Sequence, residues 1–256
     1  MCRGTVREIE VKEENDFILS VEDLRAAVTE KSRILLLNSS CNPTGGLIDR
    51  ESLQKIAEFA KEKDLFVFSD EVYRHLNFDS DEIFSIATLP GMKERTLIID
   101  SVSKSFAMTG FRVGFATGPV HLIELMTKCV ENVYSAVATP SQYAALVAFD
   151  KGMEAMMAMK KEYKKRRDFL VSRINEMDKI SCIMPKGAFY VFANIKKTGL
   201  SAEEFAERLL EKEHVAVIPG SNFSKNASGY VRISYGTSME KIEDGLNRME
   251  RFLKSL

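Results

Sequence analysis

The chain has 256 residues, of which 45% are hydrophobic and 29% are charged, and its formal net charge is -1. This length allows one large domain or two modest ones. The near-neutral charge argues against a protein that binds nucleic acid through bulk charge, and no apolar run reaches the roughly 18 residues of a membrane helix. Because the N-terminus shows no apolar signal segment, we expect a cytoplasmic protein without a nucleic-acid or membrane partner.

The cysteines and histidines indicate no metal chemistry. Cys2, Cys41, Cys129 and Cys182 are scattered and form no C-x-x-C pair, and the three histidines match no metal-ligand or catalytic-triad spacing. We therefore expect neither a disulfide framework nor a metal site, and we interpret most of the cysteines as small apolar core residues.

The first half of the chain alternates helices with short apolar strands, which is typical of an α/β domain with a mainly parallel sheet. Alternating apolar and polar residues predict a strand at Val6–Lys12, and helical spacing predicts a helix at Val21–Thr29. The apolar run Ile34–Leu37 predicts a strand that is buried on both faces. An amphipathic helix is predicted at Asp49–Lys63, with Asp49 as its N-cap. Further strands are predicted at Leu65–Ser69, Thr96–Asp100 and Arg112–Thr117.

The pattern changes after about residue 139. A helix is predicted from Ser141–Asp150 onward through Glu176, and it contains the basic run Lys160–Arg167. That run has two interpretations, a nucleic-acid patch or a solvated helix face, and its acidic neighbours favour the second. Strands and helices then alternate at Phe189–Asn194, Ala202–Lys212, Tyr230–Ser234 and Met239–Leu253. We therefore predict a large domain over residues 1–138, followed over residues 139–256 by a long connecting helix and a smaller C-terminal α+β domain.

Polar residues gather where the predicted strands end. The segments that follow three of the strands are Asn38–Gly45 (NSSCNPTG), Asp70–Tyr73 (DEVY) and Ser101–Ser105 (SVSKS), and a fourth strand carries Arg232. In an open α/β sheet the binding crevice lies just outside the carboxyl ends of the strands. We therefore expect an Asn, an Asp and a Lys to meet at one edge of the sheet.

These segments resemble those of the class I/II aminotransferases, the aspartate-aminotransferase-like branch of the fold-type I pyridoxal-phosphate (PLP) enzymes. The motifs are NPTG at 42–45, DEVY at 70–73, SVSKSFAMTGFRVG at 101–114, PGSNF at 219–223 and YVRISY at 230–235. Their order and spacing match the family over essentially the whole chain. The resemblance implies a partial PLP-transferase-like large domain, PLP as cofactor, amino-acid and 2-oxo-acid substrates, and a homodimer.

The resemblance also assigns roles around the PLP ring. Lys104 would hold PLP as a Schiff base and, once displaced, would move a proton between the substrate and the cofactor. Asp70 would pair with the pyridine nitrogen and keep it protonated, because a nearby negative charge favours the charged form. Tyr73 and Asn42 would hydrogen-bond the phenolic oxygen. Taken alone, each residue also has a structural interpretation, such as a helix N-cap for Asp70.

The remaining roles concern the phosphate and the substrate. Arg112 and Ser101 would bind the phosphate, because the planar guanidinium grips such groups bidentately, although Ser103 is a competing hydroxyl. Arg232 would bind the α-carboxylate of the amino acid in the same way, with Asn42 as a second residue that contacts the substrate. An arginine within an apolar strand is costly to bury unpaired, which favours a bound anion.

The sequence departs from the family pattern in two ways. Ser40 stands where relatives often have Pro, and Cys41 fills the variable position beside it. Relatives also have a long N-terminal segment that supplies a helix N-terminus for the phosphate and an aromatic ring for PLP, so this chain resembles the C-terminal part of an aminotransferase. We expect weak PLP binding and little transaminase activity from these residues alone.

Two other functions fit the same residues. One is a PLP-dependent C–S β-lyase, which would release pyruvate and a thiol. The other is a non-catalytic, aminotransferase-like sensor domain of a transcription regulator, which would require a DNA-binding segment elsewhere.

Overall fold

The computed structural model describes residues 4–79, 83–133 and 135–256, which form two compact units. Among the described residues, the first unit comprises 4–40, 48–75, 83–133 and 135–156. The second unit comprises 41–47, 76–79 and 157–256. None of the helices in these described ranges is both long and apolar enough to cross a membrane.

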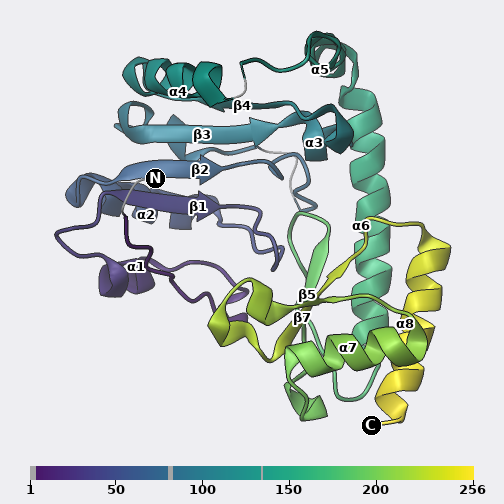
Figure 1. The fold of residues 1–256 in the computed structure, drawn as a ribbon. Coiled ribbons are helices and arrows are strands. Elements are labelled where there is room, and N and C mark those ends of the chain that lie inside the picture. The colour runs from purple at the N-terminus through teal and green to yellow at the C-terminus, as the bar shows by residue number, and fades with distance from the viewer. Residues whose placement is uncertain (1–3, 80–82, 134) are drawn as a thin grey trace. The chain divides into compact units, whose positions relative to one another are not determined.

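The first unit is built on a four-stranded sheet (Figure 1). Its strands, in spatial order, are β1 (Ile34–Asn38), β2 (Phe66–Asp70), β3 (Thr96–Ser101) and β4 (Gly114–Thr117). β1, β2 and β3 are parallel, and β4 runs antiparallel to β3, which confirms the predicted mainly parallel sheet. The parallel register brings the carboxyl ends of the first three strands to one edge, where Asn38 lies opposite Asp70.

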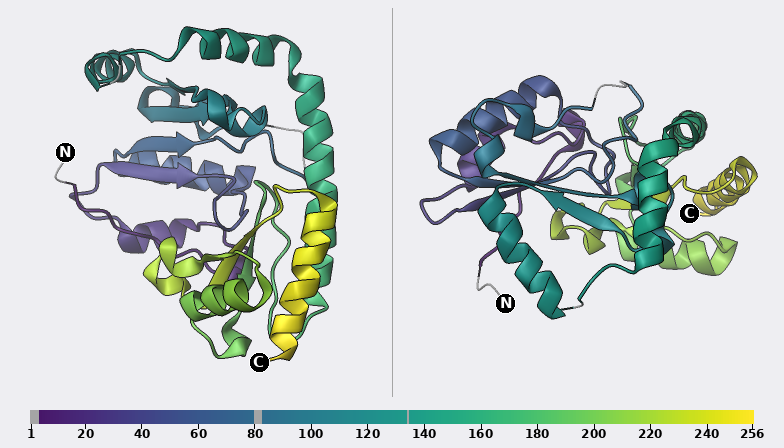
Figure 2. Two further views of the ribbon diagram at one scale, coloured as in Figure 1. Left: turned by 45° about the vertical axis from the view of Figure 1, so that its right-hand side comes forward. Right: turned by 90° about the horizontal axis from the view of Figure 1, so that it is seen from above.

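Helices lie on both faces of this sheet, but they leave one face of β1 exposed (Figure 2). They are α1 (Val21–Ala27), α2 (Arg50–Glu62), α4 (Val120–Val133) and α5 (Thr139–Lys151), with the single turn α3 (Val102–Ser105) after β3. Asp49 caps α2 as predicted, because its side chain accepts the Ser52 N–H at 2.7 Å. Ile56 and Phe59 of α2 are buried in one core with Val67 of β2. α4 was not predicted.

One strand prediction is wrong, and for another strand the predicted burial is wrong. Val6–Lys12 forms no strand, and Val6 is 83% exposed. An alternating pattern is stable as a strand only where a neighbour accepts its backbone hydrogen bonds, and no strand in the described ranges pairs with these residues. β1 is buried on one face only, since Ile34 and Leu36 are 55% and 66% exposed. An apolar run indicates that a strand favours burial on both faces. Burial on the second face also requires a second layer of structure that covers it.

The second unit contains most of α6 (Met153–Asn175) and a three-stranded antiparallel sheet in the order β5-β7-β6. Its strands are β5 (Tyr190–Asn194), β6 (Ile218–Pro219) and β7 (Tyr230–Ser234), and its other helices are α7 (Ala202–Glu213) and α8 (Met239–Lys254). These elements confirm the predicted strands and helices. Short 3-10 turns lie at Glu13–Asn15, Ile86–Thr88, Lys93–Arg95, Thr109–Phe111, Lys196–Thr198, Gly220–Asn222 and Lys225–Ala227.

The predicted continuous helix from Ser141 through Glu176 is wrong, because α5 ends before Gly152 and α6 begins after it (Figure 2). A Cβ at Gly152 would lie 2.4 Å from the Ala148 oxygen and 2.9 Å from the Phe106 ring. The close approach of Phe106 therefore requires a residue without a side chain here, and glycine also weakens a helix.

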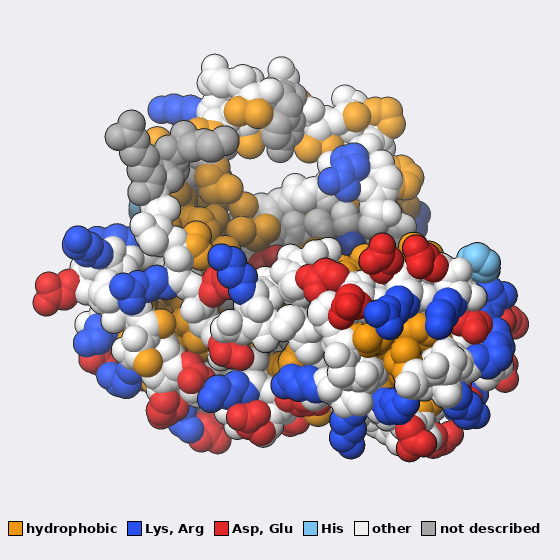
Figure 3. Space-filling model, turned by 60° about the horizontal axis from the view of Figure 1, so that its bottom comes forward, with side chains coloured by type: hydrophobic (Ala, Val, Ile, Leu, Met, Phe, Trp, Pro, Cys, Tyr) orange, Lys and Arg blue, Asp and Glu red, His pale blue; other side chains and the backbone are white. Residues whose placement is uncertain are grey.

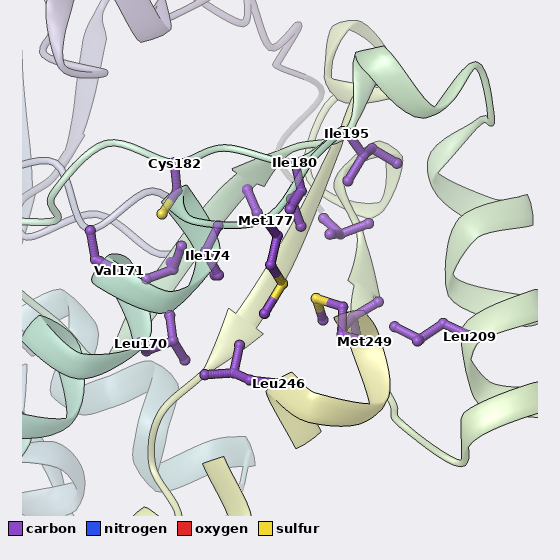
Figure 4. Close-up of a cluster of buried hydrophobic side chains, with 14 of the residues drawn as sticks. Leu170, Val171, Ile174, Met177, Ile180, Cys182, Ile195, Leu209, Leu246 and Met249 are labelled. Atoms are coloured by element: carbon purple, nitrogen blue, oxygen red, sulfur yellow. The ribbon is translucent and has the colours of Figure 1, made fainter. Parts of the chain in front are cut away.

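The core of the second unit joins α6, α7 and α8 (Figure 4). Leu170 and Ile174 of α6, Leu209 of α7 and Leu246 of α8 point toward one another, with Met177 and Met249 between them. Cys182 is buried at the edge of this cluster, as predicted for a small apolar residue. By contrast, Cys129 is exposed and Cys41 is partly buried, and Cys2 lies outside the described residues.

Charged side chains of both signs are interspersed on the face shown in Figure 3. In the basic run of α6, Lys164 lies 3.1 Å from Asp168 and Arg166 lies 3.1 Å from Glu162, so acidic residues of the same helix neutralise part of it. Arg167 differs because it is buried, where it donates to the Pro185 oxygen at 2.9 Å.

Candidate active site

Asp70 ends β2 at the edge of the first unit's sheet where the parallel strands finish. Its Oδ2 accepts a hydrogen bond from Asn38 Nδ2 at 3.0 Å, and its Oδ1 accepts one from the Val72 N–H at 3.3 Å. The neighbouring strand and the following turn therefore fix the carboxylate in place. A partly buried carboxylate held in this way is suited to accept a hydrogen bond from a cationic N–H group.

Lys104 and Tyr73 lie just beyond the ends of β3 and β2. Ser101 caps the short turn α3, because its Oγ accepts the Ser103 N–H at 3.2 Å, and Lys104 is in this turn. The Nζ of Lys104 lies 5.9 Å from the centre of the buried Tyr73 ring. An amine at this distance from an aromatic ring interacts favourably with it when charged.

Ser101 and Arg112 line the same cavity as Asp70. This cavity of the first unit has a volume of about 720 Å³, and its other walls come from β3, β4 and α4. Arg112 precedes β4 in a left-handed conformation, with Nη1 donating to the Thr109 oxygen at 2.8 Å. Ser103, the competing hydroxyl, is not among the lining residues. The cavity therefore combines a carboxylate, a hydroxyl and a guanidinium.

Two buried carboxylates and one partly exposed arginine next to these residues were not singled out from the sequence. Burial raises the pKa of the Asp100 carboxyl to about 6, although the Ser101 N–H and Arg74 favour its charged form. Burial also raises the pKa of Glu71, against hydrogen bonds from Ser85 and Ser69. Arg74 Nε lies 2.8 Å from Asp100 Oδ2. Two features of the sequence could have drawn attention to this pair: Asp100 stands at the end of an apolar strand, and Arg74 stands directly after DEVY.

Asn42 and Arg232 meet in the second unit. The Nη1 of Arg232, on β7, donates to Asn42 Oδ1 at 2.9 Å. The guanidinium lies 4.5 Å from the Tyr190 ring centre and 5.0 Å from that of Phe223. Its Nε is buried without a hydrogen-bond partner among the described residues. A guanidinium that lies over two rings, with a donor still unsatisfied, is suited to bind an anion.

The predicted residues thus fall into two groups, one in each unit. Asp70, Tyr73, Ser101, Lys104 and Arg112 belong to the first unit, and Asn42 and Arg232 belong to the second. The first group contains the functional groups that PLP requires: an amine for its aldehyde, a carboxylate for its ring nitrogen, and a guanidinium with a hydroxyl for its phosphate. The residues therefore fit this cofactor.

Comparison with known proteins decides the family, because the model of "Aminotransferase class I and II" matches residues 1–249. The chain belongs to this family. Members of the family are PLP-dependent, and the resemblance drawn from the motifs is confirmed.

Similar proteins include aminotransferases named for different substrates. An aspartate aminotransferase of Pyrococcus abyssi is 47% identical, and an aromatic-amino-acid aminotransferase of Thermococcus litoralis is 44% identical. Each match covers 99% of this chain and 66% of the relative. The crystal structure of an aromatic aminotransferase from Pyrococcus horikoshii is similar with a TM-score of 0.94 at 45% identity, over 97% of this chain and 67% of that one. The chain thus spans about two thirds of the length of the relatives it matches.

Proposed function

We propose that these residues belong to an aminotransferase that moves the amino group of an amino acid to a 2-oxo acid. The observation that carries the proposal is the position of Asp70 at the end of β2 and of Lys104 just after the adjacent parallel strand β3, with Ser101 and Arg112 lining the same cavity as Asp70. The names of the similar proteins support the same reaction class.

PLP, when bound, supplies an electron sink for the electron pair left on the amino acid's Cα after that carbon loses its proton. Asp70, oriented by Asn38, keeps a proton on the ring nitrogen, because its negative charge stabilises the cationic form. Lys104 would hold the cofactor by its aldehyde through Nζ. Once the substrate's amine has replaced it, the freed Lys104 side chain would accept the proton from Cα.

Other side chains bind and orient. Arg112 and Ser101 hold the phosphate through charge-assisted and hydroxyl hydrogen bonds. Arg232 binds the α-carboxylate, using donors that Asn42 does not occupy. By the family resemblance, Tyr73 and Asn42 would donate to the phenolic oxygen of the cofactor. These assignments require planar or directional donors at each position, which the residue types supply.

The proposal is tested by measuring amino-group exchange in the native protein. The protein is incubated with PLP, a 2-oxo acid, and either aspartate or phenylalanine, and both products are quantified. We expect equal amounts of the new 2-oxo acid and the new amino acid, and a loss of about 100-fold to 10,000-fold in rate for Lys104→Ala. Lys128→Ala, which changes an exposed lysine of α4, is the matched control and should keep the parent rate.

Other outcomes would overturn the proposal. Release of pyruvate and a thiol from cystathionine, without exchange, would favour the β-lyase. Binding of PLP without turnover of any amino acid would favour a sensor domain.

We also propose that the native protein is a cytoplasmic homodimer. The exposed apolar side chains of α5, which include Tyr143, Leu146 and Val147, support association with a second copy. Light scattering coupled to size-exclusion chromatography measures the mass in solution, and a monomer at all concentrations would contradict this part of the proposal.

A further inference from the structure

Three carboxylates lie at the ends of β2 and β3, and Arg74 lies close to two of them. Asp70 and Glu71 follow each other at the end of β2, and Asp100 is the penultimate residue of β3. Arg74 Nε is 2.8 Å from Asp100 Oδ2, and its Nη1 is 3.9 Å from Glu71 Oε2. The Asp100 side chain is only 3% exposed, so water contributes little to its solvation.

Asp100 connects this arginine to the turn that carries Lys104. Its Oδ1 accepts the Ser101 N–H at 2.6 Å, and the Ser101 Oγ in turn accepts the Ser103 N–H at the start of α3. The segment that bears Arg74 is tied to the same strand, because the Glu71 N–H donates to the Ile99 oxygen at 2.9 Å. A continuous chain of polar contacts therefore runs from Arg74 to the first turn of α3.

Arg74 favours the charged form of the Asp100 carboxyl, against the burial that raises its pKa. A buried carboxylate that loses its counterion takes up a proton, and a neutral carboxyl is a weaker acceptor for a backbone N–H than a carboxylate. Removal of Arg74 would therefore loosen the contact between Asp100 and Ser101. Removal of the Asp100 charge would loosen the same contact between Asp100 and Ser101.

We propose that Arg74 and Asp100 act as a positioning pair that holds the turn presenting the Ser101 hydroxyl and the Lys104 amine in the geometry needed to bind PLP. The inference rests on the proposed function, in which Ser101 and Lys104 contact the cofactor. Arg74 acts only through Asp100, and Asp100 acts through the main chain of Ser101. Partners of this kind, one step removed from the binding group, typically change affinity about 10-fold to 100-fold when they are lost, as measured for ligands of metal sites.

The test uses the native protein with Arg74→Gln, Asp100→Asn, the double variant, and the conservative variant Arg74→Lys. Each is titrated with PLP and reduced with borohydride, and the fraction of Lys104 that carries the cofactor is measured by peptide mass spectrometry. The melting temperature is recorded in parallel. The matched control is Arg95→Gln, which breaks an Arg–Asp pair of 3.0 Å, with Asp64, at the opposite end of β3.

We expect the PLP concentration for half-labelling of Lys104 to rise about tenfold in each single variant. The double variant should need no more PLP for half-labelling than the single variant that binds PLP less tightly, because the two residues act as one unit. Arg74→Lys should recover most of the loss. Arg95→Gln should leave half-labelling unchanged whatever its melting temperature, which a merely structural role for Arg74 would not predict.

Parent-like labelling of Arg74→Gln and Asp100→Asn would overturn the inference, and so would losses that multiply in the double variant. If Arg74→Gln does not fold, Asp100→Asn, which preserves size and shape, decides the question alone. Absence of cofactor on Lys104 in the parent would overturn the proposed function itself, and the inference with it, whereas failure of the inference alone leaves parent labelling intact.

Discussion

Gly45 of the NPTG segment should tolerate no side chain. It has a φ of +69°, and an added Cβ would lie 2.3 Å from Pro185 Cβ and 3.0 Å from the Gly187 oxygen. Its own carbonyl accepts the Lys186 and Gly187 N–H groups at 3.0 Å each, so the two loops cannot easily separate. For Gly45→Ala we expect about 1–2 kcal/mol from the left-handed backbone and about 1–3 kcal/mol from the forced contact.

Gly199→Ala separates these two contributions. Gly199 has a φ of +73°, but nothing lies within 4 Å of an added Cβ, so only the backbone cost of about 1–2 kcal/mol applies. Urea unfolding of both variants at equal m-value measures the difference in the free energy of unfolding, which we expect to be about 1–3 kcal/mol. An equal loss in both variants would refute the steric argument. Gly45→Ala should also weaken carboxylate binding by Arg232, because Asn42 lies in the same segment.

Three further predictions concern stability. Burial raises the pKa of Asp100 from 3.8 to about 6, so between about pH 4 and pH 6 the folded protein keeps a proton that the unfolded chain has lost. The contribution of Asp100 to the free energy of unfolding should therefore fall by up to about 3 kcal/mol as pH rises through this window, and Asp100→Asn should remove that part of the pH dependence in urea unfolding. In α7, Phe205→Ala should cost about 3–5 kcal/mol because the ring is fully buried, whereas Leu210→Ala at an exposed position should cost less than about 0.5 kcal/mol; similar losses in calorimetry would contradict this. Ser201→Ala should cost about 1 kcal/mol, because Ser201 and Glu204 form a capping box at the start of α7, and an unchanged melting temperature would argue against it.

The elements of the fold were predictable where the pattern itself determines the structure. Apolar runs ending in NSSCNPTG, DEVY and SVSKS located β1, β2 and β3 and placed Asp70 and Lys104 just beyond them, because strand length and turn residues are local properties. The strand at Val6–Lys12 failed because pairing depends on a partner that the pattern does not contain.

The contacts around the site were less predictable. The pair of Arg74 with Asp100 depends on the register between β2 and β3, which brings together residues that adjoin two separate motifs. The contact of Arg232 with Asn42 likewise joins residues that are far apart in the chain. Residue types suggested a role for Arg232, but they gave no indication that its guanidinium would lie over the rings of Tyr190 and Phe223.

The position at which PLP attaches covalently tests most directly whether Lys104 holds the cofactor. The native protein is incubated with PLP, reduced with borohydride and digested, and every lysine-containing peptide is examined by mass spectrometry. We expect one cofactor per chain on Lys104, with the label lost in Lys104→Ala and kept in Lys128→Ala. A cofactor distributed over other lysines, or retained covalently in Lys104→Ala, would contradict it.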